Sequence, residues 1–197
     1  MPDDLDLIEG YLVRLAHVIQ LLPRQPVLEI IQLLRKARDE KQGVFIFGNG
    51  GSAATSSHMV CDLVKNTHTE AGRPVRALSL NDNFPTFSAY ANDEGYEQVF
   101  SQPLEALGEA GDLAIAISGS GNSPNILKGI ERARQKGLTT VGLTGFAGGK
   151  LKDLVDVCLI VPSDEMEQIE DLHMVVDHLL TIVLRSDGAA EAAHKDI

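Results

Sequence analysis

The segment Val44-Phe45-Ile46-Phe47-Gly48-Asn49-Gly50-Gly51-Ser52 points to an α/β protein, because four apolar β-forming residues lead directly into a turn of small residues. The segment Leu113–Ile117, followed by Ser118-Gly119-Ser120-Gly121-Asn122-Ser123, repeats this pattern. A buried strand that enters a small-residue loop at a helix N-terminus is a common way to bind phosphate, since free N–H groups and hydroxyls face the anion. Ordinary βα turns use the same residue types. Two such loops in one chain nevertheless favour a shared anion-binding site.

Neither loop matches a nucleotide-binding motif. Residues 48–52 lack the G-x-G-x-x-G spacing, and no Gly-Lys-Ser/Thr sequence follows them, which argues against Walker-type ATP chemistry. Small hydroxyl donors without a lysine suit a phosphate monoester better than a triphosphate. The ligand that the two loops predict is therefore a phosphomonoester.

Composition narrows the class of protein further. A length of 197 residues suits one domain, and a net charge of −11 argues against nucleic acid or an anionic membrane as the main partner. No apolar stretch is long enough to span a bilayer and no basic-then-apolar leader is present, so we expect a cytoplasmic protein. Cys61 and Cys158 are too few for a disulfide framework, and we expect both to be small core residues.

Hydrophobic periodicity divides the whole chain into alternating helices and strands. Helices are expected over residues 4–22, 27–39, 52–65, 123–136 and 165–184, with helical pieces over 84–107. Strands are expected over residues 44–47, 75–80, 113–117, 139–144 and 157–161. Short apolar strands separated by helices predict a five-stranded parallel sheet sandwiched by helices, as in flavodoxin-like α/β folds. We expect one domain with N-terminal helices at 4–39, an α/β core at 43–186 and a frayed tail at 187–197.

Histidines and carboxylates on two predicted helices are candidates for a metal site. His58 and Asp62 are spaced i, i+4 and therefore share one helix face. The last helix carries a second group of ionisable residues: Glu170, His173, Asp177 and His178. Such ligands suit zinc or a similar divalent ion, although Glu170 and His178 lie about 12 Å apart along the helix axis. From spacing alone, polar positions on amphipathic helices or at a subunit contact are the more common explanation.

Several motifs together resemble the sugar isomerase (SIS) domain, over nearly the whole chain. The first motifs are the two small-residue loops, at 48–53 and 118–123, and Leu143-Thr144-Gly145. Within that superfamily the chain is most similar to the phosphoheptose isomerase family. The segments that carry this similarity are His58, Ala91-Asn92-Asp93-Glu94-Gly95-Tyr96 before Val99-Phe100, and Glu170-Asp171-Leu172-His173 leading to His178.

The resemblance implies an aldose–ketose isomerase that interconverts sedoheptulose 7-phosphate and D-glycero-D-manno-heptose 7-phosphate through an enediol, with zinc or a similar divalent metal. It assigns phosphate binding to Ser52, Ser118, Ser120 and Ser123. It assigns sugar binding to Asn49, Gly50, Gly51, Asn92, Asp93 and Gly119. It assigns metal binding to His58, Asp62, Glu170 and His178. Asp62 would act as the catalytic base and His178 as the acid.

The chain departs from the family pattern at three of these positions. The family usually has glutamate at the position of Asp62, glutamine at that of Glu170, and often threonine at that of Gly119. The Asp62 carboxylate is one methylene shorter than glutamate, Glu170 adds a negative charge, and Gly119 removes one hydroxyl donor. Two alternatives follow: an isomerase of a different sugar phosphate, or a non-catalytic SIS protein, such as a phosphosugar-binding regulator or a DnaA initiator-associating protein.

The resemblance also implies a homo-oligomer, expected to be a tetramer. The N-terminal amphipathic helix has no evident place in a five-stranded sandwich, and the last helix is apolar over much of its surface. Both features indicate surfaces that are buried between subunits. One expectation is therefore that His178 meets His58 of another subunit.

Overall fold

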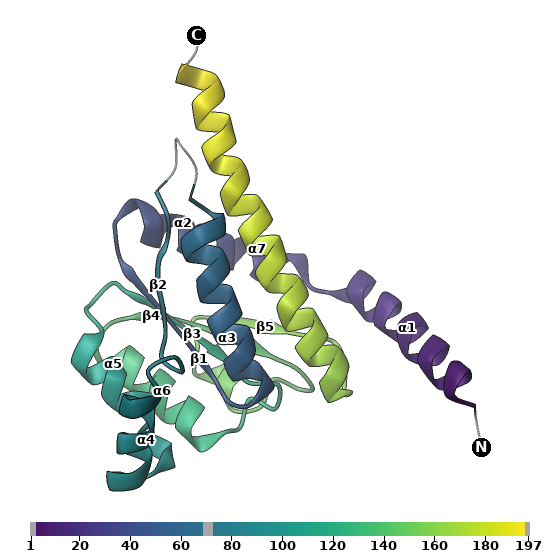
Figure 1. Cartoon of the computed structure of the whole chain (residues 1–197), viewed down its shortest axis with the longest axis horizontal. Helices are drawn as coiled ribbons and strands as arrows, with labels where there is room; N and C mark the ends of the chain where they lie inside the picture. The colour runs from purple at the N-terminus through teal and green to yellow at the C-terminus, as the bar shows by residue number, and fades with distance from the viewer. Residues whose placement is uncertain (1–2, 69–72, 196–197) are drawn as a thin grey trace.

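A five-stranded, entirely parallel sheet forms the centre of the protein, as the sequence predicted (Figure 1). The structure, a computed structural model, describes residues 3–68 and 73–195, with side chains as far as Asp187. The strands lie in the order β2-β1-β3-β4-β5. Their bounds are β1 Gly43–Gly48, β2 Arg76–Ser79, β3 Leu113–Ile117, β4 Thr139–Thr144 and β5 Val157–Ile160.

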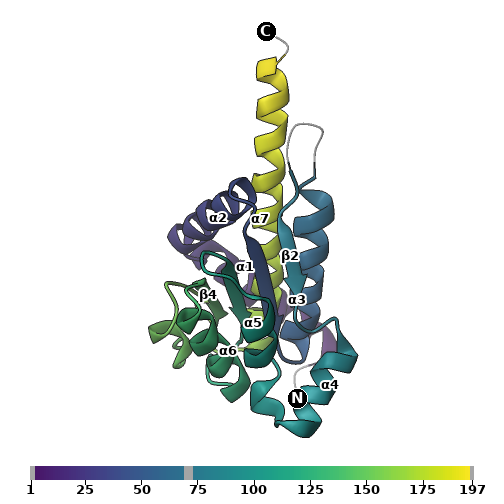
Figure 2. The same cartoon turned by 90° about the vertical axis from the view of Figure 1, so that its left-hand side faces the viewer.

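Helices cover both faces of this sheet. Their bounds are α1 Asp4–Leu21, α2 Arg24–Asp39, α3 Gly51–Cys61, α4 Phe84–Asp93, α5 Ser101–Leu107, α6 Pro124–Gln135 and α7 Met166–Lys195. The helices α2, α3 and α7 pack on one face, and α4, α5 and α6 pack on the other. The view in Figure 2 shows α7 extending well beyond the sheet toward the C-terminus. Within the described residues, no helix has both the length and the apolarity that a bilayer crossing requires.

Alternate side chains of each strand enter two separate hydrophobic cores. In β1, Val44 and Ile46 belong to the core under α2, α3 and α7, whereas Phe45 and Phe47 belong to the core under α5 and α6. Both sets are buried, which explains why the strand is apolar at every position rather than at every second one. The continuous apolar runs in the sequence were therefore a correct indication of a sheet covered on both faces.

The structure differs from the sequence-based expectation at several element ends. The predicted helix 52–65 becomes a π-helix over Asp62–Asn66, immediately after α3. Cys61, expected in the core, is exposed. The last helix continues to Lys195, past the frayed tail expected from residue 187. Its extension is supported by Arg35 and Arg38 of α2, which bind Asp187 at 2.7 Å and 3.2 Å.

A buried histidine attaches α7 to the carboxyl end of β4. The ring of His173 is fully buried, and its Nε2 lies 3.2 Å from the carbonyl oxygen of Thr144. Nε2 therefore donates this hydrogen bond, and Nδ1 has no partner among the described residues. Burial lowers the pKa of His173 to about 4, because a proton on Nδ1 would place an unpaired charge in the core.

The His173→Gln variant is expected to lose less stability than the parent protein as the pH falls below 6.5. The ordinary pKa of 6.5 falls to about 4 in the folded protein, so the unfolded chain binds more protons between these values. Stability is therefore present above pH 6.5 and is lost as the pH falls toward 4, by up to about 3 kcal/mol. Urea unfolding of chelator-treated protein at several pH values in this window measures the difference between variant and parent. Replacement of the exposed His17 by glutamine is the control and should leave the dependence of stability on pH unchanged. If His173→Gln showed the same pH dependence as the parent, the lowered pKa assigned to His173 would be contradicted.

Candidate functional site

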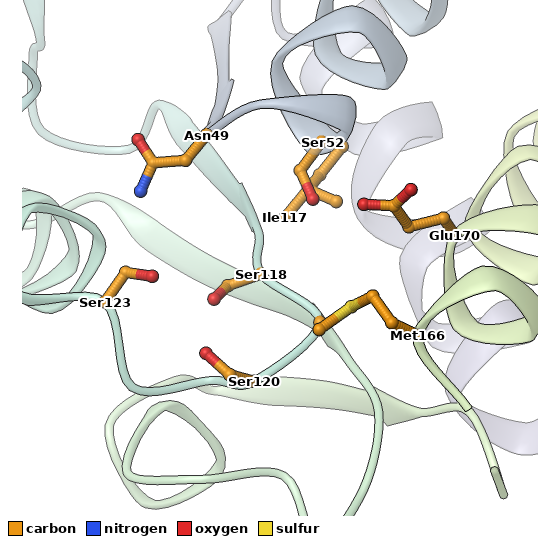
Figure 3. Close-up of a pocket in the computed structure, with 9 residues that line it drawn as sticks. Asn49, Ser52, Ile117, Ser118, Ser120, Ser123, Met166 and Glu170 are labelled. Carbon is orange, nitrogen blue, oxygen red and sulfur yellow. The ribbon is translucent and has the colours of Figure 1, made fainter. Parts of the chain in front are cut away.

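A small pocket opens beyond the carboxyl ends of β1 and β3, where ligands bind in open α/β sheets. Its polar wall consists of Asn49, Ser52, Ser118, Ser120, Ser123 and Glu170. Figure 3 shows that the serine hydroxyls converge on one space from two segments of the chain, the start of α3 and the loop between β3 and α6. The cavity measures about 150 Å³, below the roughly 300–1,000 Å³ of sites that enclose a drug-sized ligand. It can therefore enclose a phosphate group and adjoining atoms, but not a nucleotide.

Two helix N-termini supply the donors of this pocket. Ser52 lies in the first turn of α3, and Ser123 is the residue before α6, where its hydroxyl makes no capping hydrogen bond. Gly50 precedes α3 with φ +55°, a conformation that residues with a Cβ rarely adopt. The N–H groups in the first turn of α3 and the positive ends of both helix dipoles favour an anion here. In α6, Pro124 has no N–H and the Ile126 N–H donates to Asn125 Oδ1, so that helix contributes mainly its dipole.

An amide network fixes the orientation of Asn49 at the edge of the pocket. Asn49 Nδ2 donates to Asn125 Oδ1 at 2.9 Å, and Asn125 Nδ2 donates to Asn49 Oδ1 at 2.8 Å. The hydroxyl of Tyr96 donates to the same Asn49 oxygen at 3.0 Å. Because that oxygen already accepts two hydrogen bonds, Asn49 presents its remaining N–H to a ligand. The sequence did not indicate Asn125, nor that Tyr96 contacts Asn49, since these contacts join segments that are far apart in the chain.

The first turns of α7 close the other side of the pocket against glycines. A Cβ at Gly119 would lie 2.6 Å from Met166 Sδ, and one at Gly51 would lie 2.7 Å from Glu170 Oε1. A threonine at position 119 would therefore require the end of the Met166 side chain to move aside. Glu170 lies beside the N-terminus of α3, on the pocket wall (Figure 3).

A second group of side chains gathers farther along α3 and α7. The ligand atoms of His58, Asp62, Asp177 and His178 all lie within 4.8 Å of one another. The Nε2 atoms of His58 and His178 are 3.3 Å apart, and both belong to the same chain. The expectation that these two histidines meet across a subunit contact is therefore corrected: one subunit brings them together because α3 and α7 lie side by side (Figure 1).

The spacing of these atoms fits a tetrahedral metal ion. Ligands at the usual distances from tetrahedral zinc lie about 3.3–3.6 Å from one another. The separation of the two histidine nitrogens is 3.3 Å, and that of His58 Nε2 and Asp62 Oδ2 is 3.7 Å. The His58–Asp177 and His178–Asp62 separations are both 4.0 Å, so these side chains would move closer by a few tenths of an ångström around an ion. Asn66 donates a 2.7 Å hydrogen bond to Asp62 Oδ1, which leaves Oδ2 to face the histidines. The π-helix at Asp62–Asn66 therefore lies at the cluster, as such helical irregularities often do at functional sites.

The two carboxylates form the buried side of the cluster and the two imidazoles its exposed side. Asp177 is completely buried, and both of its carboxylate oxygens lack a hydrogen-bond partner among the described residues. Burial and, secondarily, the neighbouring Asp62 carboxylate raise the pKa of Asp177 to about 7. About half of each imidazole is exposed. A cation that enters from the solvent side can thus reach all four ligands.

The remaining predicted site residues lie elsewhere. Glu170 lines the phosphate pocket and is not among the four clustered residues. Asn92 and Asp93 lie exposed at the end of α4, where Asn92 donates a 2.7 Å hydrogen bond to Asp93. Neither lines the pocket.

The pocket and the cluster are connected along the same pair of helices. Ser52 and His58 are six residues apart on α3, which corresponds to about 9 Å along the axis. This separation is comparable to the length of an extended seven-carbon sugar phosphate. The arrangement can therefore hold a phosphate at one end of such a chain and reacting carbons near the other.

Comparisons with known proteins agree with this geometry. The SIS domain family matches residues 11–145. The chain is 42% identical over 137 residues to a phosphoheptose isomerase of Rhodospirillum rubrum, covering 70% of this chain and 72% of that protein. It is 44% identical over 142 residues to a phosphoheptose isomerase of Helicobacter pylori, covering 72% and 73%.

Solved structures show the same similarity in three dimensions. A phosphoheptose isomerase from Francisella tularensis superposes with a TM-score of 0.87 at 26% identity, covering 94% of this chain and all of that one. The phosphoheptose isomerase of Neisseria gonorrhoeae superposes with a TM-score of 0.85 at 26% identity, covering 92% and 98%. The chain therefore belongs to the SIS-domain family and, within it, to the phosphoheptose isomerases.

Proposed function

We propose that this aldose–ketose isomerase interconverts sedoheptulose 7-phosphate and D-glycero-D-manno-heptose 7-phosphate. One observation carries the proposal: the serine-lined pocket and the His/carboxylate cluster lie on the same pair of helices, separated by about 9 Å along α3. A sugar with its phosphate at C7 and its reacting carbons at C1 and C2 fits this separation. A short sugar phosphate would not reach from one group to the other.

The phosphate is proposed to bind through hydrogen bonds alone. Its donors are the hydroxyls of Ser52, Ser118, Ser120 and Ser123 and the free N–H groups in the first turn of α3. Among the described residues that line the pocket, none is a lysine or arginine. These phosphate contacts lie far from the reacting carbons and therefore contribute to catalysis by positioning the substrate. In this proposal the sugar is bordered by Asn49, Gly50, Gly51 and Gly119. Asn92 and Asp93 lie near the solvent-exposed end of the sugar.

Zinc or a similar divalent ion is proposed to bind at the cluster through His58, Asp62 and His178. Two carboxylates are candidates for the fourth ligand: Glu170, which the sequence predicts, and Asp177, which lies inside the cluster. When bound, such an ion polarises the carbonyl and the adjacent hydroxyl of the substrate.

Proton transfer between the two carbons requires a base and an acid. Asp62 is proposed as the base, because Asn66 holds one of its oxygens while the other faces the cluster. His178 is proposed as the acid at the substrate oxygen, because its imidazole is half exposed and can be reached from the solvent side. The two roles exchange when the reaction runs in the reverse direction.

Self-association is proposed as well, with a tetramer expected from the resemblance. The 18-residue helix α1 buries only Val18, and its apolar residues Leu5, Leu12 and Val13 are 57–71% exposed. Isolated helices of this length are marginally stable in water, so most of their stability comes from packing. Two contacts attach α1 to α7: Tyr11 donates to Asp171, and Arg14 pairs with Glu165 at 2.8 Å. A second copy of the chain is proposed to pack against the apolar side of α1.

The reaction is tested with sedoheptulose 7-phosphate and metal-stripped protein, with and without added zinc. We expect zinc-dependent turnover, and a loss of about 10²-fold or more in kcat for His178→Ala, since general acid catalysis contributes this much. Absence of turnover, combined with protection against thermal unfolding by phosphosugars, would instead identify a binding protein.

Replacement of Ser123 by alanine tests the proposed phosphate-binding site. Its hydroxyl makes no capping bond, so the variant should unfold at the parent's temperature. A hydrogen bond to a charged group contributes about 1.5–3 kcal/mol, so KM should rise roughly tenfold or more while kcat changes little. The exposed Ser186→Ala on α7 serves as the control. An unchanged KM would remove Ser123 from the phosphate site.

The oligomer is tested by sedimentation equilibrium of a Leu12→Glu variant. A charge in the apolar side of α1 should shift the protein from a tetramer to smaller species, because the interface would bury that charge. Leu107→Glu, on the opposite face at α5 and comparably exposed, should leave the assembly unchanged. A parent protein that sediments as a monomer would refute the assembly itself.

A further inference from the structure

We infer that Asp177, rather than Glu170, supplies the fourth ligand of the divalent ion held by His58, Asp62 and His178. The inference rests on the metal site proposed above and goes beyond it in naming a ligand that the family resemblance does not include. It assigns the site two imidazole nitrogens and two carboxylate oxygens.

The first argument is the isolation of the Asp177 carboxylate. The side chain is completely buried, and neither oxygen has a hydrogen-bond partner among the described residues. No described lysine or arginine lies within 4.0 Å of it, and the nearest basic atom is His58 Nε2, at that distance. A buried carboxylate without a partner is costly to the fold unless a cation completes its surroundings. A metal ion at the cluster would do so.

The second argument is the direction in which this carboxylate points. An Asp177 oxygen lies within 4.8 Å of ligand atoms from each of the three proposed ligands. His58 and His178 occupy the exposed side, whereas Asp62 and Asp177 occupy the buried side. The four atoms, from α3, the π-helix and α7, lie within 4.8 Å of one another, so one ion could contact all of them.

The third argument is the position of Glu170. Its carboxylate lies beside Gly51 at the start of α3, where a Cβ on that glycine would meet it at 2.7 Å. Glu170 and His178 are separated by about 12 Å along α7. Glu170 therefore belongs to the phosphate end of the site, where it can accept hydrogen bonds from sugar hydroxyls.

This ligand set has a consequence for the chemistry of the site. Two carboxylates balance the charge of a divalent ion, and neutral imidazoles complete it. With Asp177 as a permanent ligand, the ion does not depend on Asp62 alone for its negative charge.

Metal binding by the stripped, full-length protein provides the test, with activity as a separate readout. Zinc affinity is measured by calorimetry, the ligand set by the visible spectrum of the cobalt-substituted protein, and stability by thermal unfolding with and without metal. Asp177→Asn removes the charge with almost no change in shape. Glu170→Gln makes the same chemical change two turns earlier on α7 and is the matched control.

We expect Asp177→Asn to weaken zinc binding at least tenfold, to alter the cobalt spectrum and to lose most of the metal-induced rise in Tm. Its metal-free Tm should equal or exceed the parent's, because a buried unpaired charge is removed; a residue with a merely structural role would lower it. Glu170→Gln should bind zinc like the parent. Parent-like zinc binding and cobalt spectrum in Asp177→Asn would overturn this inference alone, whereas a parent protein that binds no metal would overturn the proposed metal site with it.

Discussion

The packing of α7 against α3 and against the carboxyl ends of the strands is the contact on which the rest of the site depends. His173 binds the last carbonyl of β4, and Met166 fills the space above Gly119. These contacts set the position of α7 along the sheet. Because Glu170, Asp177 and His178 all lie on this helix, the same contacts determine which of them face α3 and at what height.

The result is an active-site region built from two helices that lie side by side rather than from one loop. The first turn of α3 contributes Ser52 to the serine-lined pocket, its last turn contributes His58 to the cluster, and the π-helix that follows contributes Asp62. A rigid helix pair keeps the two parts at a constant separation, which is a requirement for a long substrate bound at both ends.

Buried polar groups on α7 accompany this arrangement. Asp177, His173 and Thr181 each have a buried polar atom without a partner among the described residues. Such groups oppose folding, and of the three only Asp177 lies in the cluster that could hold an ion. SIS folds of low sequence similarity also occur in transcription factors, as the sugar isomerase domain of the RpiR protein from Sphaerobacter thermophilus does at 14% identity. The chemistry therefore has to be argued from the site residues and not from the fold.

The sequence by itself determined the sheet, its two covered faces and the two phosphate loops, because strand apolarity and turn chemistry are local properties. It also identified the histidines and acidic residues, but it could not rank Glu170 against Asp177. Glu170 and Asp177 are about two turns apart on the same side of α7, so that choice depends on the height at which α7 packs along α3, and only tertiary packing decides it. The same holds for Asn125 and Tyr96, which contact Asn49 from distant segments of the chain. It also holds for the π-helix at Asp62, since no pattern in the sequence indicates its i, i+5 hydrogen bonds. Local pattern determines elements, whereas the side chains that meet between elements are determined by how those elements pack.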